Sequence, residues 1–139
     1  MKRVTADFAR VSLVAGNNFC EIAHVKAEGR EENLCLAIGA YETGLAFFTQ
    51  QRFPRQWARA KGSLGTAYGM LSEVRDKEEN LGKAIGAYGE VSKVYTLTGF
   101  PVDYAMTRSS LGNAYARLSE VRDKEENLGK AIVAYGEAL

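Results

Sequence analysis

Residue types that bind metal ions or act as nucleophiles gather near the amino-terminal end of the chain. Cys20 and His24 have the i,i+4 spacing that places both on one face of a helix, Glu21 lies beside Cys20, and Cys35 follows. Such ligands could hold a metal ion. We favour a structural role instead, because cysteines are among the residues most often buried in cores and a lone histidine near a helix end is ordinarily solvated. No metal site is therefore expected.

Nucleophilic catalysis finds little support in the same residues. His24 is the only histidine, so no second imidazole is present for a dyad. Nothing supplies a third group to orient a Cys–His pair, or an oxyanion site. No GxGxxG or P-loop pattern occurs. We expect a protein that is not an enzyme, with no catalytic residue and no cofactor.

The charge balance excludes further classes of function. Lysine and arginine number 18 and aspartate and glutamate 17 among 139 residues, for a formal net charge of +1. This balance argues against a nucleic-acid partner. No segment approaches the roughly 18 apolar residues of a membrane span, and two cysteines are too few for a disulfide framework. We expect a cytoplasmic protein with no membrane partner.

An internal repeat organises the whole chain. The fifteen residues LSEVRDKEENLGKAI occur at Leu71–Ile85 and again, 47 residues later, at Leu118–Ile132. A more diverged first copy contains Glu32-Asn33-Leu34, and its front half needs an offset of 49 because the loop near Gly29 is two residues longer. The chain is therefore interpreted as a single domain, 1–139, of three repeats, 5–53, 54–100 and 101–139.

Each repeat has the apolar periodicity of two helices. Apolar residues recur at spacings of three, four and seven, and no alternating strand pattern competes. We expect Asp76 and Glu79 to form a capping box, and the second helix of this repeat to end where Gly99 takes a positive φ and returns Phe100 over Tyr95. The expected helices are 5–26, 31–50, 54–75, 77–98, 101–122 and 124–139.

Twelve of the 14 glycines fall inside these expected helices. Close helix contact explains three of them, Gly16, Gly65 and Gly112. Nothing in the sequence explains Gly82, Gly86 and Gly129.

These residues resemble the tetratricopeptide repeat (TPR) family, in a long variant of the repeat. Leu-Gly-x-x-Tyr lies on the first helix, and Ala with an aromatic four residues later lies on the second. The common repeat has about 34 residues, so the additional residues are expected to lengthen both helices. The resemblance implies an all-α, right-handed α-solenoid of six antiparallel helices; an armadillo- or HEAT-type solenoid is the alternative. The matching residues are Leu64, Gly65, Tyr68, Ala84, Tyr88 and Pro101 for the second repeat, Leu111, Gly112, Tyr115, Ala131, Tyr135 and Ala138 for the third, and Gly16, Phe19, Ala37, Tyr41, Gly44 and Pro54 for the first.

The resemblance also implies a concave groove lined by the first helices, which binds a peptide or protein partner. The implied floor is small and polar with arginines at its edges, suited to a peptide backbone and acidic side chains; a merely solvated face is the alternative. Of the clamp that holds a C-terminal carboxylate in chaperone-binding members, only Asn17 is matched. The groove positions are Arg10, Leu13, Asn17, Glu21, Arg59, Ser63, Thr66, Met70, Met106, Ser110, Asn113 and Arg117.

The last repeat is eight residues shorter than the one before it. Solenoids need polar terminal caps, so we expect an apolar surface at Ile132, Tyr135, Ala138 and Leu139. Either the chain is part of a longer array, or a second copy covers this surface in a homodimer or higher assembly. The expected function is a non-catalytic interaction scaffold, and structural self-assembly through the terminal helices is the alternative.

Overall fold

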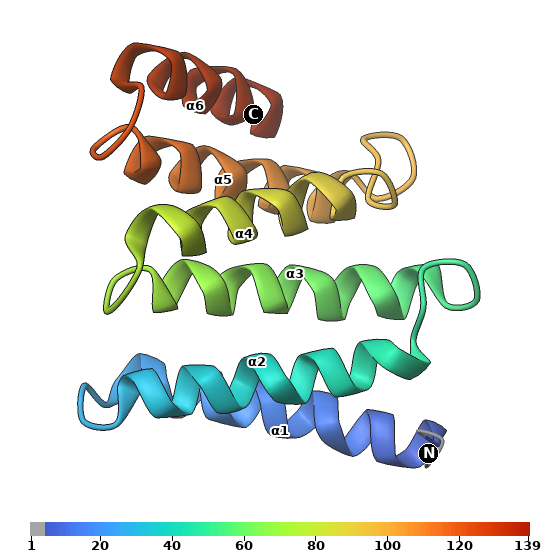
Figure 1. Cartoon of the computed structure of the whole chain (residues 1–139). Coiled ribbons are helices and arrows are strands. Elements are labelled where there is room, and N and C mark those ends of the chain that lie inside the picture. Colours follow the sequence, from blue (N-terminus) through green and yellow to red (C-terminus); the bar gives the residue numbers. More distant parts are fainter. Residues whose placement is uncertain (1–4) are drawn as a thin grey trace.

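The computed structural model describes residues 5–139, which form six α-helices and no strand. Successive helices run in alternating directions and stack one above another, from α1 to α6 (Figure 1). The turns inside each repeat lie at one side of the stack and the loops that join repeats lie at the other. The helices are α1 (Ala6–Val25), α2 (Arg30–Phe47), α3 (Pro54–Leu71), α4 (Lys77–Val91), α5 (Pro101–Leu118) and α6 (Lys124–Ala138).

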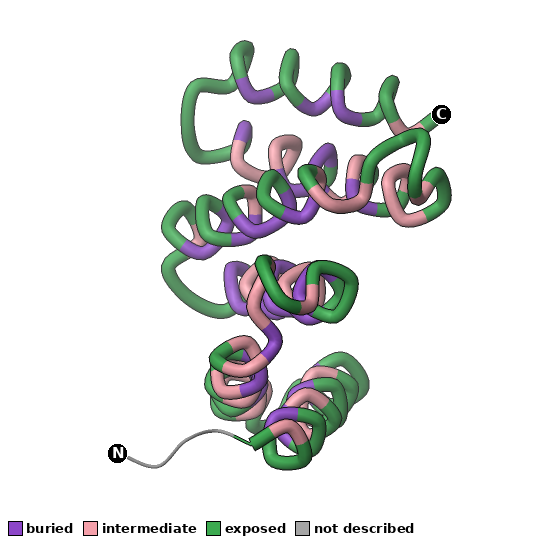
Figure 2. The backbone as a smooth tube through the Cα atoms, turned by 90° about the vertical axis from the view of Figure 1, so that its right-hand side faces the viewer, coloured by how far each residue is buried: buried purple, intermediate pink, exposed green. Residues whose placement is uncertain are grey.

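Helices pack mainly against their neighbours in sequence. Each helix contacts the next, and α3 also touches α1 and α5. Buried residues follow the sides of the helices that face one another, whereas the outer side of α6 is exposed along its length (Figure 2). This arrangement confirms the expected all-α class and the division into helix pairs.

The contact between two successive repeats has the same composition each time. Ala37 and Tyr41 of α2 pack against Leu64 of α3, and Ala84 and Tyr88 of α4 pack in the same way against the leucine of α5. Burial of these side chains is the main stabilising contribution, at about 25 cal/mol for each Å² of apolar surface removed from water.

Within each repeat, a glycine of the first helix lies against the ring of a tyrosine in the second helix. A Cβ atom at the glycine would lie 2.7 Å from the ring in the first and third repeats and 3.0 Å in the second. The expectation of close helix contact at these glycines is confirmed. The pairs are Gly16–Tyr41, Gly65–Tyr88 and Gly112–Tyr135.

Several helices end earlier than the sequence predicts. The helix expected to reach residue 98 ends at Val91, and the following residues form turns in which Thr96 Oγ1 accepts from the Gly99 N–H at 3.2 Å. The prediction of a positive φ at Gly99 is wrong, because Gly29 is the only described glycine with one. The stacking of Phe100 on Tyr95 is confirmed, with ring centroids 5.3 Å apart. The additional residues of the long repeat therefore lie largely in turns.

The expected capping box is also wrong. Asp76 occupies the N-cap position of α4, but its φ is 43° and its carboxylate makes no capping hydrogen bond. With the backbone in this left-handed conformation, the carboxylate instead accepts from Arg75 Nε at 3.0 Å. Asp123 repeats the geometry with φ 40°, and Gly29 holds the equivalent position in the first repeat.

Within residues 5–139, no helix combines the length and the hydropathy that a membrane span requires.

Candidate functional site

A hydrogen bond links the two helices of every repeat at the predicted groove positions. Tyr41 Oη donates to Asn17 Oδ1 at 2.7 Å, and the hydroxyls of Tyr88 and Thr66 lie 3.0 Å apart. In the third repeat Tyr135 Oη donates to Asn113 Oδ1. We call these three contacts the tyrosine pairs. The apolar periodicity predicts the tyrosine rings as core residues, but no pattern in the sequence indicates that their hydroxyls reach the first helix.

Burial keeps two of these tyrosines neutral. It raises the pKa of Tyr41, and it raises the pKa of Tyr88 against the opposing effect of hydrogen bonds with Thr66 and Ser110. Each hydroxyl is therefore fixed as a neutral hydrogen-bonding group.

A groove of about 220 Å³ lies between α3 and α5, beside the second tyrosine pair. It gathers five of the predicted positions, and Gly62, Tyr88 and Tyr95 also line it. We call it the α3–α5 groove. The predicted residues that line it are Arg59, Ser63, Thr66, Met106 and Ser110.

The groove carries one exposed positive charge and one negative charge. Arg59 has no acidic side chain within ion-pair distance in the described part of the chain. Asp103 also lines the groove, and both charges act on Tyr95. Burial is the largest influence and raises the pKa of Tyr95; Asp103 acts in the same direction and Arg59 in the opposite one. The Arg59 guanidinium thus has no ion pair within residues 5–139.

Other predicted groove residues take part in packing or lie apart from this groove. Leu13 packs so closely on Gly44 that a Cβ atom there would overlap it, and Met70 packs against the cluster of Ala23, Leu34 and Leu71. Glu21 is exposed on α1, and Arg10 pairs with Asp7 at 3.2 Å on the same exposed helix.

Arg117 connects two repeats. Its guanidinium donates to the Gly69 carbonyl oxygen at 3.2 Å and to Ser72 Oγ at 2.8 Å, and lies 3.6 Å from a Glu73 carboxylate oxygen. These contacts join α5 to the end of α3. Arg117 is therefore engaged inside the molecule, whereas Arg59 is not.

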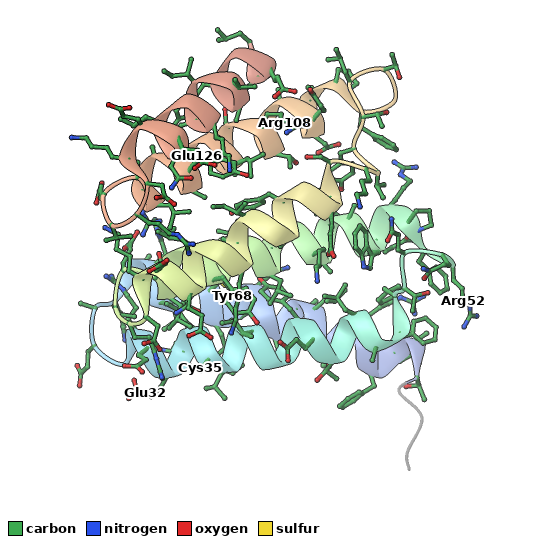
Figure 3. The ribbon with its side chains drawn as sticks, turned by 45° about the horizontal axis from the view of Figure 1, so that its top comes forward. Glu32, Cys35, Arg52, Tyr68, Arg108 and Glu126 are labelled. Carbon is green, nitrogen blue, oxygen red and sulfur yellow. The ribbon has the colours of Figure 1, made fainter. Side chains whose placement is uncertain are left out.

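A second, larger hollow of about 600 Å³ lies between α2 and α4, over α3. Tyr68, labelled in Figure 3, donates to Glu42 Oε1 at 3.3 Å, and the Lys83 ammonium lies 5.3 Å from the centre of its ring. Lys61 pairs with Glu90 at 3.4 Å. Lys83 pairs at 3.4 Å with Glu79, which lies outside the lining, so each charged group of this hollow already has a partner, in contrast to Arg59. No motif in the sequence predicts this hollow.

The metal-binding alternative is not supported by the positions of its residues. Nowhere in residues 5–139 do three histidine, cysteine or acidic side chains gather as metal ligands would. Cys20 is half-buried, and burial raises the pKa of its thiol. Cys35 lies exposed on α2 (Figure 3), and His24 is exposed at the end of α1.

The predicted association surface is largely exposed. Ile132 and Tyr135 are exposed on α6, Leu139 is exposed just after it, and Ala138 is half-buried.

No protein-family model, no curated protein and no solved structure matches the chain. A functional assignment therefore depends on the geometry described above.

Proposed function

We propose that this chain is a TPR-like, right-handed α-solenoid whose concave face binds a peptide or a peptide segment of a protein partner, as a non-catalytic interaction scaffold. The observation that carries this proposal is the α3–α5 groove, an open polar groove with an unpaired arginine beside a fixed tyrosine pair. Its place between two first helices matches the binding face that the TPR resemblance implies.

The composition of the groove supports a peptide ligand. The Ser63 and Ser110 hydroxyls can both donate and accept hydrogen bonds, as a peptide backbone requires. A Cβ atom at Gly62 would meet no neighbouring atom within 4 Å, so a main chain can approach α3 closely there. Arg59 offers a charge-assisted, bidentate contact to an acidic side chain, and Met106 an adaptable apolar one.

The dimensions also favour a peptide over a small molecule. At about 220 Å³, the groove is smaller than the roughly 300–1,000 Å³ of ordinary small-molecule sites. It suits a few residues of a chain that continues along the surface. We place this function in the cytoplasm, where the free thiols Cys20 and Cys35 remain reduced.

The recurring contacts support a TPR-like interpretation over an armadillo or HEAT one. Two residue types that carry the resemblance, the glycine of the first helix and the tyrosine of the second helix, are in contact. They occupy equivalent places in all three repeats. An armadillo or HEAT solenoid does not explain the Leu-Gly-x-x-Tyr pattern.

The exposed apolar face of α6 favours a second candidate function, structural self-assembly. Leu128, Ile132 and Tyr135, spaced four and three residues apart along one side of this helix, are 38%, 71% and 37% exposed. Apolar side chains in such number on one helix face indicate an interaction surface.

Selection from a phage-displayed library of random dodecapeptides tests the groove. Gly62→Arg places a long side chain in the groove, and Gly89→Arg is the matched control on the open outer side of α4; neither Cβ would meet a neighbour within 4 Å. Peptides selected on the wild-type protein should bind Gly89→Arg normally and lose at least about tenfold in affinity for Gly62→Arg. Arg59→Glu should weaken acidic peptides selectively.

Two outcomes would contradict the groove proposal. One is that no peptide is enriched on the wild-type protein at high display valency. The other is that the enriched peptides bind Gly62→Arg and wild type equally well.

A further inference from the structure

The exposed face of α6 repeats a face of α4 that another helix covers. Leu128 is 38% exposed, whereas Leu81 at the same place in α4 is fully buried. Tyr135 is 37% exposed and Tyr88 only 8%. In α4, the covering element is α5, whose Leu111 packs against Tyr88. The chain itself thus shows which kind of helix fits this face: the first helix of a repeat.

The opposite end of the molecule exposes the complementary face. Phe8 and Ile22 of α1 are 56% and 41% exposed, while their counterparts in α3, Trp57 and Leu71, are buried. Trp57 packs beside Leu45 of α2, and Leu71 beside Leu34 of α2. No repeat precedes α1 within residues 5–139, so these positions have no second helix of a preceding repeat to pack against. Val11 and Val14, 66% and 58% exposed, add to the same apolar surface.

From these two faces we infer that the chain associates head to tail, with α1 of one copy packed on α6 of the next. The contact between copies then repeats the contacts of α3 on α2 and of α5 on α4. This inference deepens the self-assembly candidate and names its partner surface, and it does not depend on peptide binding in the α3–α5 groove.

Charge provides a second, smaller contribution. Between repeats, Glu31 pairs with Arg75 at 2.9 Å and Glu78 pairs with Arg122 at 2.7 Å. Glu125 is the next residue of this series, and within residues 5–139 it has no ion-pair partner.

The loop after α1 of a second copy offers Lys26 to that carboxylate. Glu28 lies in the same loop, so the pair is weaker than the two inside the chain, and the apolar residues carry most of the association.

Association of unlike faces has a distinct geometric consequence. A contact of α6 with α6 would close in a dimer, whereas a contact of α6 with α1 leaves one free face of each kind. Assemblies therefore grow in length as the protein concentration rises. The tyrosine pairs then continue from the third repeat of one copy to the first repeat of the next.

Two charged substitutions, one on each face, distinguish the possible arrangements. Val11→Asp and Ile132→Asp both change exposed residues, so each variant should fold, as circular dichroism can verify. Sedimentation velocity from micromolar to submillimolar concentration should show the wild-type protein growing in size and each variant remaining monomeric. An equimolar mixture of the two should form a dimer and nothing larger, because only one intact α1 face and one intact α6 face remain. Leu97→Asp, at an exposed apolar residue of the α4–α5 loop, should assemble as the wild type does.

Several results would overturn the inference. A wild-type protein that stays monomeric throughout the range has no such contact. Dimers of Val11→Asp alone would mean α6 on α6, and dimers of Ile132→Asp alone would mean α1 on α1. The charge pair gives a separate readout: Glu125→Lys and Lys26→Glu should each weaken association by roughly twofold to fivefold, and the two together should restore it. Failure of this association with intact peptide binding would refute only the self-assembly proposal.

Discussion

Alanine substitution of helix glycines separates those that the packing requires from those that it does not. At Gly16, a Cβ atom would lie 2.7 Å from the ring of Tyr41, against an ordinary contact of 3.4–4 Å. That ring is only 2% exposed, and its hydroxyl is bonded to Asn17, so it cannot easily give way. At Gly86 and Gly129, the same atom would meet nothing within 4 Å.

The two groups should change stability in opposite directions. Gly86→Ala and Gly129→Ala should each raise the free energy of unfolding by about 0.5–1 kcal/mol, the difference between glycine and alanine inside a helix. Gly16→Ala gains the same amount but introduces overpacking that costs about 1–3 kcal/mol, so a net loss of up to about 2.5 kcal/mol is expected. Gly112→Ala should lose less, because Tyr135 is 37% exposed and can move outward.

Urea denaturation followed by far-ultraviolet circular dichroism measures these differences directly. The double variant with both open glycines replaced should show the sum of the two gains, because their side chains share no contact. A stabilised Gly16→Ala would refute the argument that close contact requires glycine at the tyrosine pairs. Losses above about 0.5 kcal/mol at Gly86 or Gly129 would show that these helix faces are not open in solution.

Three further predictions concern other features of the fold. Burial raises the pKa values of Tyr41 and Tyr88 above the usual 10.0, so the native state keeps protons that the unfolded chain loses. The free energy of unfolding should therefore be unchanged below pH 10 and fall as the pH rises beyond it, with tyrosinate absorbance appearing on unfolding. Phenylalanine at both positions should make this decline shallower. Leu81→Ala should lower the free energy of unfolding, measured by urea denaturation, by about 2–5 kcal/mol. Leu128→Ala should lower it by less than half as much, since Leu128 is 38% exposed. Equal losses would contradict the difference in burial. Asp76→Ala should destabilise by about 1 kcal/mol because its φ is 43°, whereas Asp76→Gly should stay within about 0.5 kcal/mol of wild type in thermal melts, and the reverse order would argue against the left-handed backbone.

The helices and their pairing could be predicted from the sequence because the repeat multiplies a weak signal. A single apolar stripe is ambiguous, but the same stripe at the same place in three repeats also aligns the glycines and tyrosines that touch. The ends of the helices could not be predicted in this way. Val94 and Tyr95 continue the apolar spacing of α4 into the turns after Val91, so periodicity cannot locate the end of the helix.

Local conformation set a second limit. Asp76 and Glu79 have the spacing of a capping box whether or not the backbone allows one, and the left-handed φ of Asp76 is a property of the turn that precedes α4. Arg117 set a third. Its hydrogen bonds go to the Gly69 carbonyl and the Ser72 hydroxyl, which carry no charge, and its ion-pair partner Glu73 lies 44 residues away in the sequence, so no local charge pattern indicates the contact.

Under the proposed function, specificity in the α3–α5 groove would follow from the positions at which the repeats differ. The tyrosine pairs recur in all three repeats, and the second of them lines this groove, so under the proposed function they would favour a peptide main chain without selecting its sequence. The position held by Arg59 is arginine in the first repeat and Met106 in the third. A partner that lies along the groove must therefore place an acidic group near the second repeat and an apolar group near the third. Exchange of these two residues, Arg59→Met with Met106→Arg, should reverse the order of acidic and apolar residues in the peptides selected, without loss of the tyrosine pairs.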